Sequence, residues 1–224
     1  MSEKTVKLIE NFVSWQGEGP DSGRTMIILR FKTCNLKCAW CDTAVKMRVS
    51  AEAPYLLSDI QETIDERRAG ILVTGGEPTV GRHIDDAVSL LTDLDYPIAN
   101  VESNGYQLEE LVNRSPKSKN IHFMYSPKIF NTNNLRKAYE KTESLLEFDD
   151  VYFKIVWENN DFLNSYCKWL SDKVQGRRSA ERIWLMPEGV TRVDLIKNAG
   201  EAFDACERFK FNYSSRSHII FGFV

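Results

Sequence analysis

Short apolar runs recur along the chain between longer stretches of mixed character. Each run is four to six residues long and rich in β-branched, aromatic or other apolar side chains, which is typical of buried strands. The runs are Met26–Phe31, Ile71–Thr74, Ile98–Ser103, Ile121–Ser126, Val151–Val156 and Ile183–Pro187. We therefore predict six buried strands.

The stretches between these runs carry the spacing of amphipathic helices. Each is long enough for a right-handed crossover between parallel strands. They are Ser58–Ala69, Ile84–Leu94, Leu135–Leu146, Asp161–Val174 and Arg192–Phe211. The alternation predicts an α/β fold with a mostly parallel sheet, in which reactive groups gather where the strands end and the βα loops open.

Length and composition favour one domain over residues 1–224, because 224 residues with 42% hydrophobic content can bury one sizeable core. The net charge of −3, with scattered Lys and Arg, gives no support to nucleic-acid or membrane binding and favours a small-molecule substrate. The N-terminus lacks the features of a signal peptide, and no run has the apolar length to span a bilayer. We expect a cytoplasmic protein with reduced thiols.

Three cysteines follow the first predicted strand in a CxxxCxxC spacing: Cys34, Cys38 and Cys41. Three thiolates leave one iron of a cubane without a protein ligand, which suits a 4Fe-4S cluster that binds and reduces a small molecule at that iron. Cys167 and Cys206 lie far away in predicted helices, where cysteine commonly behaves as a small buried hydrophobe.

Two simpler interpretations of the cysteines stay open. One is a zinc site completed by His83, His122 or His218, although structural zinc sites usually use two paired CxxC-like motifs. The other is three unrelated buried thiols. A disulfide framework does not fit, because it calls for an even number of cysteines in a short secreted chain and this chain has five.

The cysteine loop and the run Thr74-Gly75-Gly76-Glu77-Pro78 together resemble the radical S-adenosylmethionine (SAM) superfamily. That resemblance implies a partial (β/α)6 barrel that holds a 4Fe-4S cluster and SAM at its C-terminal mouth. Within the superfamily, further motifs resemble the 7-carboxy-7-deazaguanine synthase family. They are Trp15-Gln16-Gly17-Glu18-Gly19, Arg30 four residues before Cys34, Cys41-Asp42-Thr43, Glu102-Ser103-Asn104-Gly105, Ser126-Pro127-Lys128 and Arg216-Ser217-His218.

The resemblance implies a lyase that converts 6-carboxy-5,6,7,8-tetrahydropterin to 7-carboxy-7-deazaguanine with loss of ammonia, a step toward queuosine and related deazapurines. The radical would come from SAM cleaved at the cluster, so no side chain is expected to be catalytic. The family further implies Mg2+, an electron donor such as flavodoxin or ferredoxin, and a homodimer.

The resemblance also assigns residues to SAM. Gly75 and Gly76 would let the backbone approach the methionine moiety, although a plain turn also explains them. Trp40 would pack on the adenine edge or else fill the core. The Ser126-Pro127-Lys128 run would contact SAM, whereas a solvated lysine after a strand is the simpler explanation.

Substrate contacts follow in the same way. A pterin offers a donor and acceptor edge that Gln16, with the backbone of Trp15 and Gly17, would read, and its carboxylate invites the Arg30 guanidinium. Thr74 is a further family contact.

Two of the implied roles have structural alternatives. Arg30 would otherwise pair with Glu18 or Asp42, because buried arginine is nearly always partnered. Thr43 matches the family's Mg2+ ligand, and otherwise it caps the turn after the cysteine loop.

Some positions depart from the family. Leu185-Met186-Pro187-Glu188 stands where the family often has Gln-Pro, and the tail after Arg216 keeps little beyond Arg216 and His218. We therefore interpret the chain as a divergent member. Two rival functions remain: an activating enzyme that installs a glycyl radical in a partner protein, and a homologue that binds SAM and a cluster without this turnover.

Overall fold

The chain forms two compact units in the computed structural model, which describes residues 4–38, 41, 43, 48–129 and 132–223. The first unit comprises Met1–Gln16 and Gly23–Met124, and the second comprises Gly17–Ser22 and Tyr125–Val224. The short segment Gly17–Ser22 therefore packs with residues from the second half of the sequence. The prediction of a single domain over the whole chain stays a prediction.

The first unit contains a sheet with the strand order β2-β3-β5-β6-β7. These strands are β2 (Glu10–Trp15), β3 (Thr25–Phe31), β5 (Gly70–Gly75), β6 (Ala99–Ser103) and β7 (Ile121–Tyr125). β3, β5 and β6 run parallel, whereas β2 pairs antiparallel with β3. The four strands that the sequence predicts in this region are confirmed, and β2 is a further strand of this sheet that the sequence analysis did not predict.

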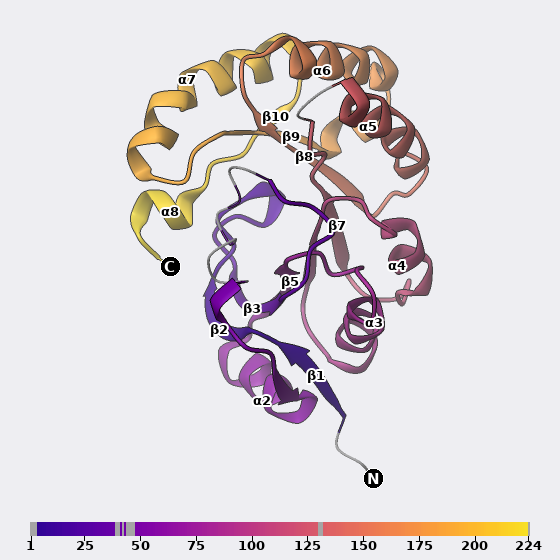
Figure 1. Ribbon diagram of the computed structural model, residues 1–224, viewed down its shortest axis with the longest axis vertical. Coiled ribbons are helices and arrows are strands. Elements are labelled where there is room, and N and C mark those ends of the chain that lie inside the picture. The colour runs from indigo at the N-terminus through magenta and orange to yellow at the C-terminus, as the bar shows by residue number, and fades with distance from the viewer. Residues whose placement is uncertain (1–3, 39–40, 42, 44–47, 130–131, 224) are drawn as a thin grey trace. The chain divides into compact units, whose positions relative to one another are not determined.

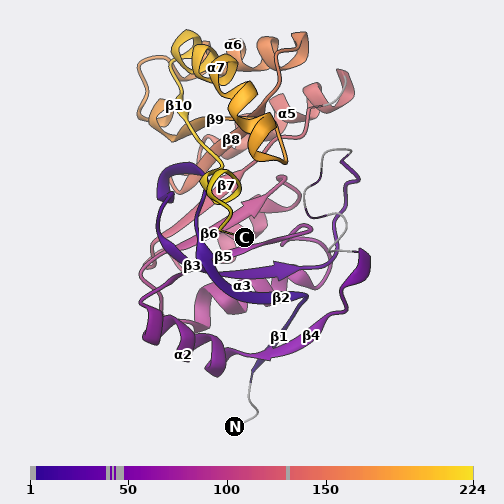
Figure 2. The same cartoon turned by 90° about the vertical axis from the view of Figure 1, so that its left-hand side faces the viewer.

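Helices and a second small sheet complete the first unit. The helices are α2 (Leu57–Arg67), α3 (His83–Asp93) and α4 (Leu108–Arg114). α2 and α3 confirm two predicted helices to within two residues. α2 ends because Arg68 takes a left-handed conformation (φ 49°) and donates its N–H to the Ile64 carbonyl. β1 (Thr5–Leu8) pairs antiparallel with β4 (Ala53–Leu56) beside α2, as Figure 2 shows.

One face of the first unit's larger sheet changes from apolar to polar along the strands. Residues two apart on a strand share a face. Ile28 and Leu72 are in register on β3 and β5, and two positions further Arg30 is in register with Thr74. Asn100 on β6 lies beside Leu72. The polar side chains therefore begin toward the carboxyl ends of the strands, where the sequence predicts the site.

The apolar parts of this sheet form the core of the unit. A buried cluster on the face just described consists of Met26, Ile28, Leu72 and Ile98, with Phe12 packed against it. The opposite face carries fully buried side chains from three parallel strands, namely Ile27, Leu29, Ile71, Val73, Ala99 and Val101. Burial on both faces explains why β3, β5 and β6 appear in the sequence as nearly continuous apolar runs.

The second unit contains three parallel strands in the order β10-β9-β8. They are β8 (Val151–Trp157), β9 (Ile183–Pro187) and β10 (Asn212–Tyr213). The unit also contains α5 (Thr132–Leu145), α6 (Asp161–Val174), α7 (Arg192–Phe209), α8 (Ser217–Phe221) and the short 3-10 helices η1 (Gly19–Asp21) and η2 (Arg178–Arg182). Figure 1 shows α5, α6 and α7 along the outer side of these strands.

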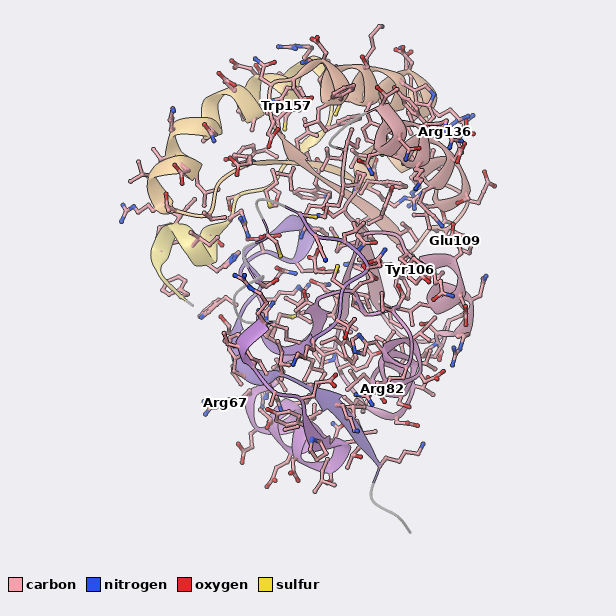
Figure 3. All side chains as sticks on the ribbon, in the orientation of Figure 1. Arg67, Arg82, Tyr106, Glu109, Arg136 and Trp157 are labelled. Atoms are coloured by element: carbon pink, nitrogen blue, oxygen red, sulfur yellow. The ribbon has the colours of Figure 1, made fainter. Side chains whose placement is uncertain are left out.

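Local signals set the ends of these helices. α6 begins after Asn160, whose side-chain oxygen accepts the Leu163 N–H at 3.0 Å, and its bounds match the predicted range. α7 begins after Thr191 in the same way and ends at Lys210, which takes a left-handed conformation. On α5, Arg136 faces outward and pairs with Glu140 across an exposed turn (Figure 3). Of the helices in the described ranges, none combines the length and apolar character that crossing a bilayer requires.

Candidate active site

The end of β5 lies directly against the backbone that leads into the cysteine loop. The Gly76 N–H donates to the Phe31 carbonyl at 2.9 Å, and the Glu77 N–H donates to the Thr33 carbonyl at 2.8 Å. A Cβ on Gly76 would lie 2.1 Å from the Thr33 oxygen. Gly75 has a φ of +123°, and a Cβ there would lie 2.2 Å from the Phe31 oxygen. The chain's own packing therefore requires both glycines, and their contact with SAM stays a prediction.

Glu77 connects this glycine turn to the turn after β6. Its side chain is buried, and Oε1 accepts hydrogen bonds of 2.8 Å from the hydroxyls of Ser103 and Thr79. Oε2 accepts the Asn104 N–H at 2.7 Å. Burial raises the pKa of Glu77 above its ordinary value, although these hydrogen bonds from neutral donors oppose the shift. This role of Glu77 was not predicted from the sequence, where its signal is an acidic residue two positions after a buried strand.

The cysteine loop presents three partly buried cysteine side chains, Cys34, Cys38 and Cys41. Cys34 Sγ accepts the Leu36 N–H at 3.4 Å, and the Thr43 hydroxyl lies 3.5 Å from Cys41 Sγ. The thiolate is the form of cysteine that ligates iron. Trp40, the predicted adenine contact, lies outside the described residues.

Three thiolates in one loop suit a cubane cluster, and their role as its ligands stays a prediction. Within the described ranges, no three or more His, Cys, Asp or Glu side chains are grouped so as to hold one metal ion. A cubane makes a different demand, because each thiolate ligates its own iron. His83, one candidate for completing a zinc site, instead stacks on Phe31 at a ring distance of 4.7 Å, with Nδ1 3.2 Å from the Glu77 carbonyl.

The other two cysteines differ from the loop cysteines in their surroundings. Cys167 on α6 and Cys206 on α7 are buried. Burial raises the pKa of the Cys206 thiol to about 11 and raises that of Cys167 even further. Both therefore stay protonated at neutral pH, which supports the prediction that they are not cluster ligands.

Arg30 and Thr74, two predicted substrate contacts, lie side by side at the polar end of the first unit's sheet. They are in register on the parallel strands β3 and β5. Arg30 Nε also donates to Glu10 Oε2 at 2.7 Å, across the antiparallel pair that β3 forms with β2. Among the described residues, Arg30 therefore pairs with Glu10, whereas Glu18 pairs with Lys154 and Arg216. Asp42, the other partner that the sequence suggested, lies outside the described residues. The two terminal NH2 groups of the guanidinium remain as further donors.

Gln16 and Trp15, predicted to read the pterin edge, differ in exposure. Gln16 is 3% exposed, and its Nε2 donates to Asn100 Oδ1 at 2.7 Å. Its backbone closes the loop between β2 and β3, because its oxygen accepts the Gly23 N–H at 2.7 Å. Trp15 is 50% exposed. The Gln16 amide thus reaches the strand face that carries Arg30 and Thr74, and its contact with a substrate stays a prediction.

Glu18 is the centre of a buried charge network in the second unit. Its Oε2 accepts a hydrogen bond from Lys154 Nζ at 2.5 Å, and its Oε1 accepts one from Arg216 Nε at 2.9 Å. His218 Nε2 lies 3.9 Å from the same Oε1. Burial raises the pKa of Glu18, but the charges of Lys154, Arg216 and His218 outweigh burial and hold the pKa well below its ordinary value.

The backbone around Glu18 is fixed by the same C-terminal segment. The Gly17 carbonyl accepts the Ser217 N–H at 3.0 Å, and the Gly19 N–H donates to Ser214 Oγ at 2.8 Å. A Cβ on Gly17 would lie 1.9 Å from Nδ1 of His218, so this contact requires glycine. Gly17, predicted as a backbone contact to substrate, is therefore also a packing residue.

Ser126, Pro127 and Lys128 form the turn after β7. Lys128 Nζ donates to Ser126 Oγ at 2.7 Å, and Pro127 is buried. Because of this bond the Lys128 side chain folds back toward Ser126 and does not extend into solvent. Contact between this turn and SAM stays a prediction.

The motifs that form this arrangement also occur in known proteins. The profile of the Radical SAM superfamily matches residues 28–152, which include the cysteine loop, the glycine turn and the Ser126–Lys128 turn. The chain belongs to the radical SAM superfamily. The family implies a 4Fe-4S cluster and SAM, and the three thiols of the loop fit that cluster.

Relatives of this radical SAM protein confirm the predicted resemblance. A 7-carboxy-7-deazaguanine synthase from Hyperthermus butylicus is 24% identical and covers 96% of this chain and 92% of its own length. One from Thermoplasma acidophilum is 29% identical over 79% of this chain and 88% of its own. The crystal structure of QueE from Escherichia coli matches with a TM-score of 0.61 at 18% identity, covering 94% of this chain and 93% of that one. The predicted fold class, an α/β partial barrel of the radical SAM type, is thereby confirmed.

We expect Gly76→Ala to destabilise the protein by about 1–3 kcal/mol or more, because the new methyl group would overlap the Thr33 backbone. Urea unfolding measures the loss, and iron content after reconstitution should fall as the cysteine loop moves. Gly200→Ala is the matched control: a Cβ there meets nothing within 4 Å, so this helical substitution should be neutral or stabilising by up to about 1 kcal/mol. Equal stability of Gly76→Ala and the wild type would contradict the close contact.

We expect Glu18→Gln to lower the free energy of unfolding at pH 7 by about 3–5 kcal/mol, because Lys154 and Arg216 would lose their buried counter-charge. The pKa of Glu18 is depressed in the folded protein, so its contribution is complete above about pH 4.3, the usual value for an unfolded chain. The difference between wild type and variant should therefore shrink as the pH falls below about 4. Urea unfolding across this range measures it.

The exposed pair Arg136–Glu140 supplies the control for that series. Glu140→Gln should change stability by less than about 0.5 kcal/mol. A difference between wild type and Glu18→Gln that does not depend on pH would exclude ionised Glu18 as its source.

Proposed function

We propose that the chain is a 7-carboxy-7-deazaguanine synthase, a radical SAM lyase that converts 6-carboxy-5,6,7,8-tetrahydropterin to 7-carboxy-7-deazaguanine with loss of ammonia. The observation that supports this proposal best is the extent of the similarity to the Hyperthermus butylicus synthase. That similarity covers 96% of this chain and 92% of the synthase. A similarity of that extent includes both units and not the cluster motif alone.

Cluster and SAM would be held by the loops that follow the strands. Cys34, Cys38 and Cys41 would supply three thiolates to the cluster, and SAM cleaved with an electron from the cluster would supply a 5'-deoxyadenosyl radical. Contacts to SAM are assigned to Trp40, Gly75, Gly76, Ser126, Pro127 and Lys128. The protein's own contribution is to position these groups and to exclude water, because the cofactor carries the hard chemistry.

Substrate recognition would use the polar end of the first unit's sheet. Arg30 and Thr74 are neighbours there, and the Arg30 guanidinium, whose Nε donates to Glu10, also carries two NH2 groups of the kind that suit a carboxylate. Gln16 would read the pterin edge together with the backbone of Trp15 and Gly17. Its amide is already oriented by Asn100, which lowers the entropy lost on binding.

Mg2+ is proposed at Thr43. The hydroxyl lies 3.5 Å from Cys41 Sγ, so one hard oxygen ligand would stand at the edge of the cluster loop. Mg2+ usually keeps several waters and takes few protein ligands, which fits a single hydroxyl completed by substrate oxygens.

The rival functions are less well supported. The two relatives from Hyperthermus butylicus and Thermoplasma acidophilum are named as 7-carboxy-7-deazaguanine synthases, and neither is named as an activating enzyme. Our proposal further includes a cytoplasmic location, a homodimer, a flavodoxin or ferredoxin as electron donor, and a product that feeds queuosine or another deazapurine.

One anaerobic assay tests the proposed function. The cluster is reconstituted, SAM and dithionite are added, and 7-carboxy-7-deazaguanine is measured with and without the carboxylated tetrahydropterin. Product that appears with the wild type and not with Cys38→Ala supports the proposal. SAM cleavage without conversion of this pterin would favour an activating enzyme, and a cluster that never cleaves SAM would favour a binding homologue.

We expect Arg30→Gln to weaken binding of the carboxylated pterin by about 2–5 kcal/mol, the range for truncating one partner of a desolvated charge pair. Steady-state kinetics should show this as a raised KM. Glu10→Gln is the control, because it breaks the same ion pair and leaves the guanidinium in place. If both variants raise KM equally, Arg30 is structural.

Thr43→Ala should retain the cluster and lose most of the stimulation of turnover by Mg2+, because it removes one hydroxyl and no thiolate. Activity is measured against MgCl2 concentration after treatment with a chelator. Thr43→Ser keeps the hydroxyl and should respond as the wild type does. An unchanged Mg2+ response in Thr43→Ala would return the residue to a capping role.

A further inference from the structure

We propose that Asn104 raises the reduction potential of the cluster through a hydrogen bond from its side-chain amide to Cys34 Sγ. The inference rests on the proposed function in one respect, namely that Cys34 ligates the cluster. Asn104 belongs to the Glu102–Gly105 motif, to which neither the sequence nor the proposed mechanism assigns a task for this side chain.

The geometry gives the amide one orientation. The Tyr106 N–H donates to Asn104 Oδ1 at 3.2 Å, so the oxygen end of the amide is committed to its own turn. The nitrogen end therefore faces the cysteine loop, where Nδ2 lies 2.9 Å from Asn35 Oδ1 and 3.8 Å from Cys34 Sγ. The NH2 group carries two N–H donors, one for each acceptor.

The backbone of Asn104 is hydrogen-bonded to the buried carboxylate of Glu77. Its N–H donates to Glu77 Oε2 at 2.7 Å, and the neighbouring Gly105 N–H donates to Ser103 Oγ at 3.0 Å. Ser103 in turn donates to Glu77. The same carboxylate thus anchors the glycine turn and the residue that faces Cys34, so Asn104 is positioned by the core and not by a free loop.

The effect on the cluster follows from charge. Reduction adds one electron to the oxidised 2+ cluster, gives the 1+ state and neither makes nor breaks a covalent bond. The added charge spreads onto the thiolate sulfurs, and an N–H dipole whose positive end faces a sulfur stabilises the reduced state more than the oxidised one. Hydrogen bonds to cluster sulfurs are among the factors that set reduction potentials. The Leu36 N–H supplies a second such donor to Cys34, which a side-chain substitution at Asn104 leaves intact.

A redox titration separates this role from a purely structural one. Asn104→Leu has nearly the same shape and no donor. The wild type and the variant are reconstituted, their iron content is matched, and the cluster is titrated with dithionite under EPR in the absence of SAM and pterin. We expect the equilibrium constant for one-electron reduction to fall about tenfold in the variant, which is about 59 mV toward more negative potential.

Asn35→Ser is the matched control. It removes Asn35 Oδ1, which accepts from Asn104 at 2.9 Å and also lies 3.8 Å from Cys34 Sγ, and it leaves the Asn104 donor toward Cys34 in place. The equilibrium constant for one-electron reduction should therefore stay within about threefold of the wild-type value. If Asn35→Ser shifts the potential as much as Asn104→Leu does, loosening of the loop explains both and the proposal is wrong.

Asn104→Asp covers the case in which the leucine variant takes up no iron. It keeps an oxygen for the Tyr106 N–H and removes both donors, so its potential should be at least as negative as that expected for Asn104→Leu. A wild-type potential in either variant overturns the inference and leaves the proposed function standing. A wild-type protein that binds no cluster overturns both.

Discussion

Two glycines allow β5 to lie against the backbone that leaves β3, with no side chain between the two segments. The hydrogen bonds from Gly76 and Glu77 to Phe31 and Thr33 then fix where the cysteine loop begins. Glu77 can reach the turn after β6 because this contact has already placed it. The position of the first thiol, and of the donors around it, therefore depends on a backbone approach that any Cβ would prevent.

Two buried carboxylates show how differently the chain stabilises a negative charge. Glu77 is surrounded by neutral donors, and its pKa is raised because hydrogen bonds do not fully replace water. Glu18 is surrounded by cations, and its pKa is lowered although its side chain is only 12% exposed. The first arrangement joins turns within one unit through hydrogen bonds from neutral donors. The second places a carboxylate within hydrogen-bonding distance of Lys154 and Arg216, two cations in the interior.

The sequence predicted what depends on local pattern. Strands buried on both faces and helices with regular spacing were found, and the side chains at the carboxyl ends of β3 and β5 lie where parallel topology places them. β2 was missed because its alternation is diluted by Glu10 and other polar residues, and α4 because seven residues are too few for a clear period. Partners distant in sequence had no local signal. A lysine in an apolar strand, such as Lys154, indicates that a counter-charge is needed, but the sequence does not indicate that Glu18 supplies it. The packing role of Gly17 likewise depends on His218.

The partners of Gly17–Ser22 have a consequence for how the protein folds during synthesis. Gly19 and Glu18 take their partners from residues 195 and 198 positions later in the chain. At a translation rate of about 5–20 residues per second, roughly 10–40 seconds pass before Ser214 and Arg216 exist. Over that interval β2 and β3 can already pair as a hairpin, with Gly17–Ser22 as a hydrated loop between them. Emergence of Arg216 from the ribosome is then the event that removes Glu18 from water.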